Sequence, residues 1–319
     1  MGGLISPFPV ARPCATFGHV QQARKRTPRL RYRERLRYNL CHGTTLDRRV
    51  PFHCQSSGTE VVLSEGGIDE VAATFVEHVC NRLDSPSITV SLGTGGIISS
   101  FLERIASSEF KSHRERVKFV PTSMAVSSEC GLLGLAVSPL ARDTAIDIHI
   151  DQADEVHVDR DRVYYIVGRG ENGPQVGQPD IPCVHVAVRG AKELIIFTED
   201  HIFDMRLSGM LPVVIEGGLE DEWEECAEEV DDIFLGDAEV MRRSHSAEAN
   251  TRGYPDPVIT KDGYMILDLF FYSDFKLFGE SVDYETFEST LIKIPGVVSS
   301  GLVAVPTSAN KVTIASTSN

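Results

Sequence analysis

The sequence predicts an α/β protein with an open, mostly parallel Rossmann-like sheet and an inserted, smaller ferredoxin-like α+β domain. Between residues 66 and 198, β-rich segments alternate with helical segments, which is typical of a parallel sheet covered on both faces. After Leu207 the order changes to strand, helix, two strands, helix and strand, the order of a ferredoxin-like unit. We therefore expect a leader at 1–58, a main α/β domain at 59–207 plus 304–319, and a small α+β domain at 208–303.

The expected elements of the main domain follow from hydrophobic periodicity. Apolar residues at every third or fourth position predict a helix over 66–83, which Ser85-Pro86 ends. The β-branched run at 88–92 predicts a buried strand. The other expected elements are a helix at 97–106, a strand at 117–120, a helix at 123–131, a strand at 145–150 that ends at Asp151, and a strand at 194–198.

The elements expected in the small domain also follow from the pattern of apolar residues and from turn signals. Its helix at 220–234 carries many acids, and its apolar stripe predicts that these acids coat a solvated face and do not bind metal. The turn signal Lys261-Asp262-Gly263 interrupts a strand expected at 258–271. The remaining expected elements are strands at 211–215, 239–243 and 297–303, a helix at 284–294, and a last strand at 311–315 that returns to the main sheet.

Composition excludes several classes of protein. The 319 residues are long enough for two domains, and 42% hydrophobic with 24% charged residues is close to the globular average. No apolar run reaches the roughly 18 residues of a membrane span. A net charge of −15 disfavours nucleic acid as a partner, because such binding depends on Lys and Arg. Seven scattered cysteines without a CxxC spacing fit neither a disulfide framework nor a zinc site and suit a reducing compartment.

The leader differs sharply in charge from the rest of the chain. Residues 1–58 hold eleven Lys and Arg against two acids, and they lack the apolar core of a secretory signal. This composition favours an organelle transit peptide. Two alternatives stay open: a plain disordered tail, or a lipidated or binding tail, since Met1-Gly2 followed by Ser6 fits the N-myristoylation pattern.

A glycine-rich turn follows the strand expected at 88–92. Gly93, Thr94, Gly95 and Gly96 join that strand to a helix, and backbone N–H groups at such a turn can bind an anion. The sequence matches neither the dinucleotide fingerprint nor the GK[ST] nucleotide loop, so neither NAD nor ATP is favoured. The alternative is a tight turn in which glycine serves packing alone.

Three acids follow the strand expected at 145–150. Asp151, Asp154 and Glu155 would gather at the carboxyl end of a parallel strand, where open α/β sheets bind ligands. Crowded carboxylates acquire separated pKa values and can act as acid or base near neutral pH. Capping of the next segment and binding of a divalent cation are the alternatives.

Taken together, these pieces resemble ribose-5-phosphate isomerases of the A type, in family order across about 65–319. The Asp-x-Ala-Asp-Glu motif and the last two matching stretches are the most specific. The matching stretches are 90–95 before a helix, 120–123, 148–156, 194–197, 211–213, 258–263 with 266–268, and 294–298 with Gly301-Leu302.

The resemblance implies an isomerase that interconverts ribose 5-phosphate and ribulose 5-phosphate through an enediolate, with no cofactor and no metal. It also implies a small sugar phosphate as partner, a homodimer, and, with the basic leader, a plastid location; the cytoplasm is the alternative. Asp151 and Asp154 would be catalytic, facing the sugar and assisting ring opening and proton transfer. The residues expected to bind substrate or phosphate are Gly93, Thr94, Gly95, Gly96, Ser123, Gly168, Arg169 and Gly170.

The chain departs from the family pattern at several site positions. Gly96 and Ile97 replace a Ser-Thr pair, Gln152 replaces a glycine, and Val167 replaces a lysine. The helix that carries the family's Glu-Lys pair is expected to be a loop over 171–182. Val184 and His185 fall at the pair's positions, and the alternating valines predict a sheet histidine at 185.

Two other residues near the expected site could replace the family's glutamate and lysine. Glu171, beside the Gly168–Gly170 turn, is the candidate base, and Arg169 is a candidate phosphate ligand. A catalytically degenerate paralogue that binds a sugar phosphate or a protein partner is the competing hypothesis, because loss of a general base typically costs ~10²–10⁴ in rate.

Overall fold

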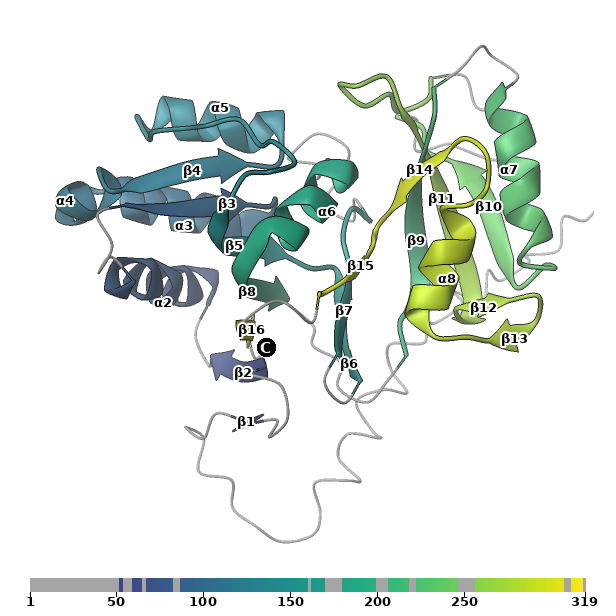
Figure 1. Cartoon of the computed structure of the whole chain (residues 1–319), viewed down its shortest axis with the longest axis horizontal. Helices are drawn as coiled ribbons and strands as arrows, with labels where there is room; N and C mark the ends of the chain where they lie inside the picture. The colour runs from purple at the N-terminus through teal and green to yellow at the C-terminus, as the bar shows by residue number, and fades with distance from the viewer. Residues whose placement is uncertain are drawn as a thin grey trace, which may run out of the picture. The chain divides into compact units, whose positions relative to one another are not determined.

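The main sheet is mostly parallel, as the alternation of strands and helices predicts (Figure 1). The computed structural model describes residues 52–53, 59–64, 67–82, 87–159, 162–169, 180–198, 206–217, 222–245, 256–306 and 311–317. Within these residues the main sheet has seven strands, and only β1 runs antiparallel to its neighbour. In spatial order they are β1 (Phe52–His53), β2 (Thr59–Ser64), β16 (Lys311–Thr317), β8 (Ala191–Thr198), β5 (Ile146–Gln152), β3 (Ile88–Leu92) and β4 (Val117–Pro121).

The strand order places a topological switch point at β3. The chain passes from β3 to β4 on one side and then returns to β5 on the other side. Neighbouring loops at such a point leave in opposite directions, and open α/β sheets bind ligands in the crevice that this creates. The carboxyl ends of β3 and β5 are therefore the place where the fold favours a site.

Helices bury both faces of the main sheet. Side chains alternate along each strand, so Ile195 and Phe197 join the core under α2 and α3, whereas Leu194 and Ile196 join the core under α6. The helices of this domain are α2 (Ile68–Asn81), α3 (Gly96–Ala106), α4 (Lys111–Arg114), α5 (Met124–Leu132) and α6 (Ile181–Gly190), with a short 3₁₀ turn at Ser108–Phe110.

The small domain has the predicted ferredoxin-like order. Its four-stranded antiparallel sheet runs β10-β11-β9-β14, and α7 and α8 cover one face (Figure 1). An aromatic cluster fills the core, with ring centroids of Phe234 and Phe271 5.0 Å apart and those of Phe275 and Phe287 5.3 Å apart. The elements are β9 (Ser208–Ile215), α7 (Glu222–Asp232), β10 (Ala238–Arg242), β11 (Met265–Asp274), α8 (Tyr284–Leu291) and β14 (Val297–Ser300), with a two-residue pair β12 (Lys276–Leu277) and β13 (Glu280–Ser281).

The acids of α7 lie where the apolar stripe predicts. Trp223, Cys226 and Val230 are buried against the small sheet. The exposed acids of this helix are Glu224, Glu225, Glu228, Glu229 and Asp232. No helix among the described residues is both long and apolar enough to cross a membrane.

Several element predictions were wrong. In the strand expected at 258–271, the interruption predicted at Lys261-Asp262-Gly263 is confirmed, since the chain reverses at Gly263 (φ +85°) and Ile259 pairs back with Met265, but the continuous strand begins only at Met265. The strand expected at 297–303 is two strands, since β15 (Leu302–Ala304) leaves the small sheet and pairs with β7. The hairpin of β6 (Glu155–Asp159) and β7 (Arg162–Ile166) was not predicted, and β5 extends past Asp151 to Gln152.

His185 was expected in a sheet but lies in α6. Asp180 caps this helix by accepting from the Cys183 N–H (3.3 Å), and Pro182 stands in the first turn. Ile181, Val184, His185 and Val188 are buried, which is a helical spacing. The loop predicted over 171–182 therefore ends before Ile181, and its residues up to 179 lie outside the described residues.

His185 meets an acid of α8. Its Nε2 is 2.8 Å from the Ser300 carbonyl oxygen, and its Nδ1 is 3.8 Å from Glu288 Oε1. Burial raises the pKa of Glu288 to about 7, against the opposing charge of Arg189. Burial also lowers the pKa of His185, so both groups favour their neutral forms in the folded protein.

Glu288→Gln should stabilise the protein progressively as pH rises. The folded carboxyl keeps its proton up to about pH 7, whereas the ordinary pKa of a glutamate is 4.5, so the folded state binds more protons than the unfolded state between these values. The stability that the protonated Glu288 side chain contributes to the wild-type protein is thus fully present below about pH 4.5. It is lost as pH rises through about 7. Urea denaturation at several pH values should show the variant gaining about 2 kcal/mol over wild type by pH 8. The exposed control Glu280→Gln should follow wild type; a Glu288→Gln advantage that does not change with pH would contradict the prediction.

Candidate functional site

The glycine turn and the first aspartate meet at the switch point. In the parallel pairing of β3 with β5, Leu92 stands opposite Ile150, and the Gly93 N–H donates to the Ile150 carbonyl oxygen (2.8 Å). A Cβ on Gly93 would overlap the Asp151 carboxylate and come within 3.1 Å of the Asp151 Cα. Gly93 is thus required here because any side chain would displace Asp151.

Asp151 is held on all sides by the protein. Its side chain is 1% exposed. Oδ1 accepts from the Gln152 N–H (2.9 Å), Oδ2 accepts from the Tyr165 hydroxyl (3.3 Å), and His149 Nε2 lies 3.5 Å from Oδ2. Burial and the nearby Asp151 carboxylate raise the pKa of Tyr165 well above 10, so the phenol keeps the proton that it donates. The Asp151 carboxylate is therefore oriented by buried groups of β5 and β7.

Gln152 lies over the rest of the turn. Its side-chain Oε1 accepts from the Ile97 N–H (3.2 Å) in the first turn of α3. Gly95 has φ +123°, and a Cβ there would come within 2.6 Å of Gln152 Cδ. Thr94 is 6% exposed. The glycine turn and the Asp151-Gln152 dipeptide thus pack directly on each other.

Asp154 is the exposed acid of the motif. Its Oδ2 accepts from the Arg169 backbone N–H (2.9 Å), next to Gly168, which has φ +88°. The guanidinium of Arg169 points elsewhere: it donates to Glu155 Oε2 (2.5 Å) and to the carbonyl oxygens of Ser208 (2.5 Å) and Met210 (2.7 Å). Arg169 therefore uses its charged group to join β6 to β9.

The remaining expected site residues divide into two groups. Ser123 is buried and caps α5, since its hydroxyl oxygen accepts from the Val126 N–H (3.3 Å). Gly170 and Glu171 lie outside the described residues.

The three acids of the motif do not share a ligand position, because Asp151 faces Tyr165, Asp154 faces the Arg169 N–H and Glu155 faces the Arg169 guanidinium. In the part of the chain that the structure describes, no group of three or more His, Cys, Asp or Glu residues could hold a metal ion.

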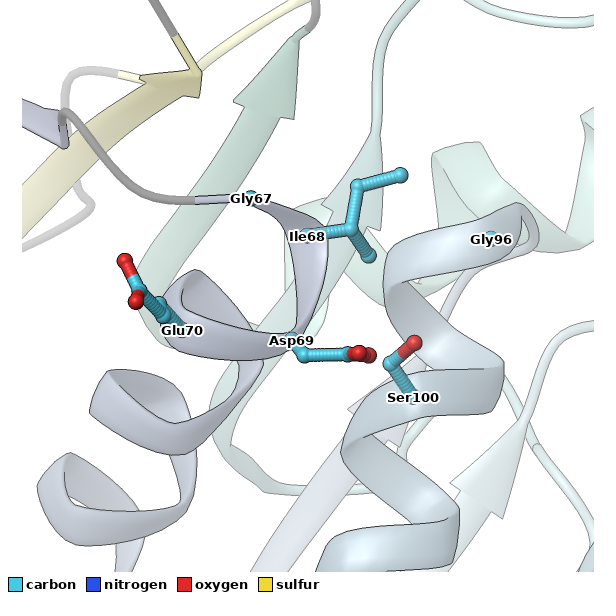
Figure 2. Close-up of a pocket in the computed structure, with 6 residues that line it drawn as sticks. All are labelled: Gly67, Ile68, Asp69, Glu70, Gly96 and Ser100. Carbon is cyan, nitrogen blue, oxygen red and sulfur yellow. The ribbon is translucent and has the colours of Figure 1, made fainter.

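An open hollow of about 530 Å³ lies where α2 and α3 begin (Figure 2). Gly96 marks one side of it, and the Asp69 side chain reaches across toward Ser100. Both charged side chains that line it are acids, Asp69 and Glu70, in the first turn of α2. The hollow therefore carries negative charge beside the glycine turn.

Sequence reasoning missed two contacts of this site. Tyr165 lies in β7, a strand that periodicity did not reveal, so nothing in the sequence linked it to Asp151. Gln152 stood out as a departure from the family pattern, but its contact with Ile97 depends on how β5 and α3 are placed.

Known proteins resemble this chain over most of its length. The family model for ribose 5-phosphate isomerase A (phosphoriboisomerase A) matches residues 118–319. The ribose-5-phosphate isomerase A of Roseiflexus sp. is 28% identical over 229 residues, which are 71% of this chain and 84% of the relative. That of Thermococcus kodakarensis is 29% identical over 237 residues, 74% of this chain and 91% of the relative.

Solved structures agree on the fold. The ribose 5-phosphate isomerase of Plasmodium falciparum superposes with a TM-score of 0.59 at 21% identity, covering 78% of this chain and 94% of that chain. The enzyme of Methanocaldococcus jannaschii gives a TM-score of 0.55 at 21% identity, over 74% and 89% of the two chains. With a family model that matches well over half of its residues, this chain belongs to the ribose 5-phosphate isomerase A family.

Proposed function

We propose that this chain catalyses the family reaction, the interconversion of ribose 5-phosphate and ribulose 5-phosphate. Family membership supports this, and so does the contact of Gly93 with Asp151 at the switch point of the sheet. A related solved structure is described as a complex with phospho-erythronic acid, a phosphorylated sugar acid. The contact of Gly93 with Asp151 is the observation that carries the proposal, because it joins an anion-binding turn to the acidic motif.

The reaction moves a proton from C2 of the aldose to C1 through an enediolate. It needs a base near C2, a donor to the developing oxyanion, and an anchor for the phosphate. We assign the anchor to the backbone N–H groups of Thr94, Gly95 and Gly96, since the Gly93 N–H donates to Ile150, and we assign proton transfer at the sugar to the exposed carboxylate of Asp154. Asp151, being buried, holds the turn in place, and Glu171 is the proposed base at C2.

Asp154→Asn should lower kcat for ribose 5-phosphate about 10²-fold, because an amide cannot exchange the proton. A coupled assay of the full chain measures this. The matched control is Asp159→Asn, at the far end of β6, which should keep the wild-type rate. Glu171→Gln should show a similar loss. Wild-type turnover by both Asp154→Asn and Glu171→Gln would remove these assignments.

A second function, binding without turnover, has its own supporting observation. Gln152 covers the α3 N-terminus, and the Arg169 guanidinium is engaged by Glu155, so two groups expected at a phosphate site are occupied by the protein itself. A chain that only binds would show a higher melting temperature with ribose 5-phosphate and no conversion above the buffer rate. Conversion that Asp154→Asn lowers would exclude this second function.

The basic composition of residues 1–58 supports the further proposal of a plastid transit peptide. A fluorescent fusion of the full chain in plant cells should accumulate in plastids. Mass spectrometry of the recovered fusion should find a shortened N-terminus. A full-length N-terminus with fluorescence in the cytoplasm would favour the cytoplasmic alternative.

Resemblance to the family also supports a homodimer. Light scattering on the purified chain should give about twice the mass of 35.1 kDa expected for one copy. A mass of one copy across a range of concentrations would contradict this.

A further inference from the structure

Gln152 occupies a position that suits an anion. The first N–H groups of a helix have no partner within the helix, and an anionic oxygen can accept from them. In α3 the Ile97 N–H already donates to the side-chain oxygen of Gln152 (3.2 Å). The carboxamide thus satisfies a donor that a bound phosphate would otherwise engage.

The glycine turn leaves no spare room beneath this side chain. At Gly95, a Cβ would come within 2.6 Å of Gln152 Cδ and 2.8 Å of Gln152 Cβ. Gly95 also has φ +123°, a backbone conformation that other residues rarely adopt. The Gln152 side chain and a phosphate therefore cannot contact the same face of this turn together.

Two charged features lie near the glycine turn. The hollow beside Gly96 is lined by Asp69 and Glu70. The cation expected nearby, Arg169, donates to Glu155 Oε2 (2.5 Å) and to two carbonyl oxygens. A phosphate at α3 must therefore displace Gln152 while the Arg169 guanidinium stays engaged by Glu155.

We infer that Gln152 limits the affinity for phosphate, because its side chain competes with the substrate's phosphate for the N-terminus of α3. Binding of a phosphorylated sugar then requires the Gln152 side chain to turn away from Ile97, and the lost hydrogen bond reduces affinity for phosphate. This inference rests on the proposed function, in which the glycine turn anchors the phosphate.

Two substitutions at Gln152 should change phosphate affinity in opposite directions. Gln152→Ala removes the competing oxygen and should bind inorganic phosphate about 3- to 10-fold more tightly, the range expected from one neutral hydrogen bond. Gln152→Glu places a carboxylate at the same N–H group and should weaken binding at least about 10-fold by like-charge repulsion. Isothermal titration of the full chain with inorganic phosphate measures both.

The control is another helix cap. Asp283→Ala removes the side chain that accepts from the Thr286 N–H (2.7 Å) at the start of α8, a comparable structural loss in the small domain. It should leave phosphate affinity unchanged. Melting temperatures identify any variant that has not folded, and Gln152→Asn, which keeps the amide on a shorter side chain, then takes the place of Gln152→Ala.

The inference and the proposed function can fail separately. If Gln152→Ala binds phosphate no more tightly than wild type, Gln152 is only a structural cap and the inference is wrong, whatever the isomerase assay gives. If Gln152→Ala binds phosphate more tightly and no variant converts ribose 5-phosphate, the inference stands and the proposed catalysis is wrong.

Discussion

Gly93→Ala should destabilise the protein by about 3 kcal/mol or more and remove turnover of ribose 5-phosphate. The new Cβ would overlap the Asp151 carboxylate and would also lie 3.1 Å from the Asp151 Cα, so rotation of one side chain cannot relieve the overlap. Moving Asp151 breaks its contact with the Tyr165 hydroxyl and leaves a buried carboxylate without that donor. Urea denaturation and the coupled assay measure the two effects.

The control for this change is Gly131→Ala in α5. An added Cβ at Gly131 meets nothing within 4 Å, and alanine favours helix over glycine, so this variant should be as stable as wild type or slightly more stable. If Gly93→Ala were equally harmless, the close packing of the glycine turn on Asp151 would not be a property of the protein in solution.

Arg243→Met should cost about 3–5 kcal/mol of unfolding free energy, because it leaves a buried carboxylate without its partner. Arg243 Nε lies 3.1 and 2.9 Å from the two carboxylate oxygens of Asp268, and its Nη2 lies 2.5 Å from one of them. The side chains of both residues are about one-tenth exposed. Burial raises the pKa of Asp268 even with Arg243 in place. Chemical denaturation of the small domain within the full chain measures the loss.

A double variant separates the ion pair from the burial of charge. Arg243→Met with Asp268→Leu removes both charges and should recover most of the stability that Arg243→Met loses. The exposed pair of Lys192 with Asp147 is the comparison: Lys192→Met should cost less than about 1 kcal/mol. Equal losses for Arg243→Met and Lys192→Met would show that burial does not govern these pairs.

The sequence could predict elements whose residues share one strong period. The helix at Ile68–Asn81 and the strand at Ile88–Leu92 have such periods and form close to their predicted bounds. Some short segments are strands only because they pair with other segments, and their sequences show no such hydrophobic period. β7 is one of them, with β6 on one side and β15 on the other. In α6, the alternation of valines at 184, 186 and 188 predicts a strand. The segment forms a helix because Asp180 caps it and because its buried residues lie on one helical face.

The sequence by itself determined the fold class and the meeting of the glycine turn with Asp151, because parallel strands bring their carboxyl ends to one edge. Only the tertiary structure decided what each side chain at that edge contacts. Asp151 is buried under Tyr165, Gln152 caps α3, and the charge of Arg169 goes to Glu155. These contacts join segments 14 to 55 residues apart along the chain, so their formation depends on packing that local sequence does not encode.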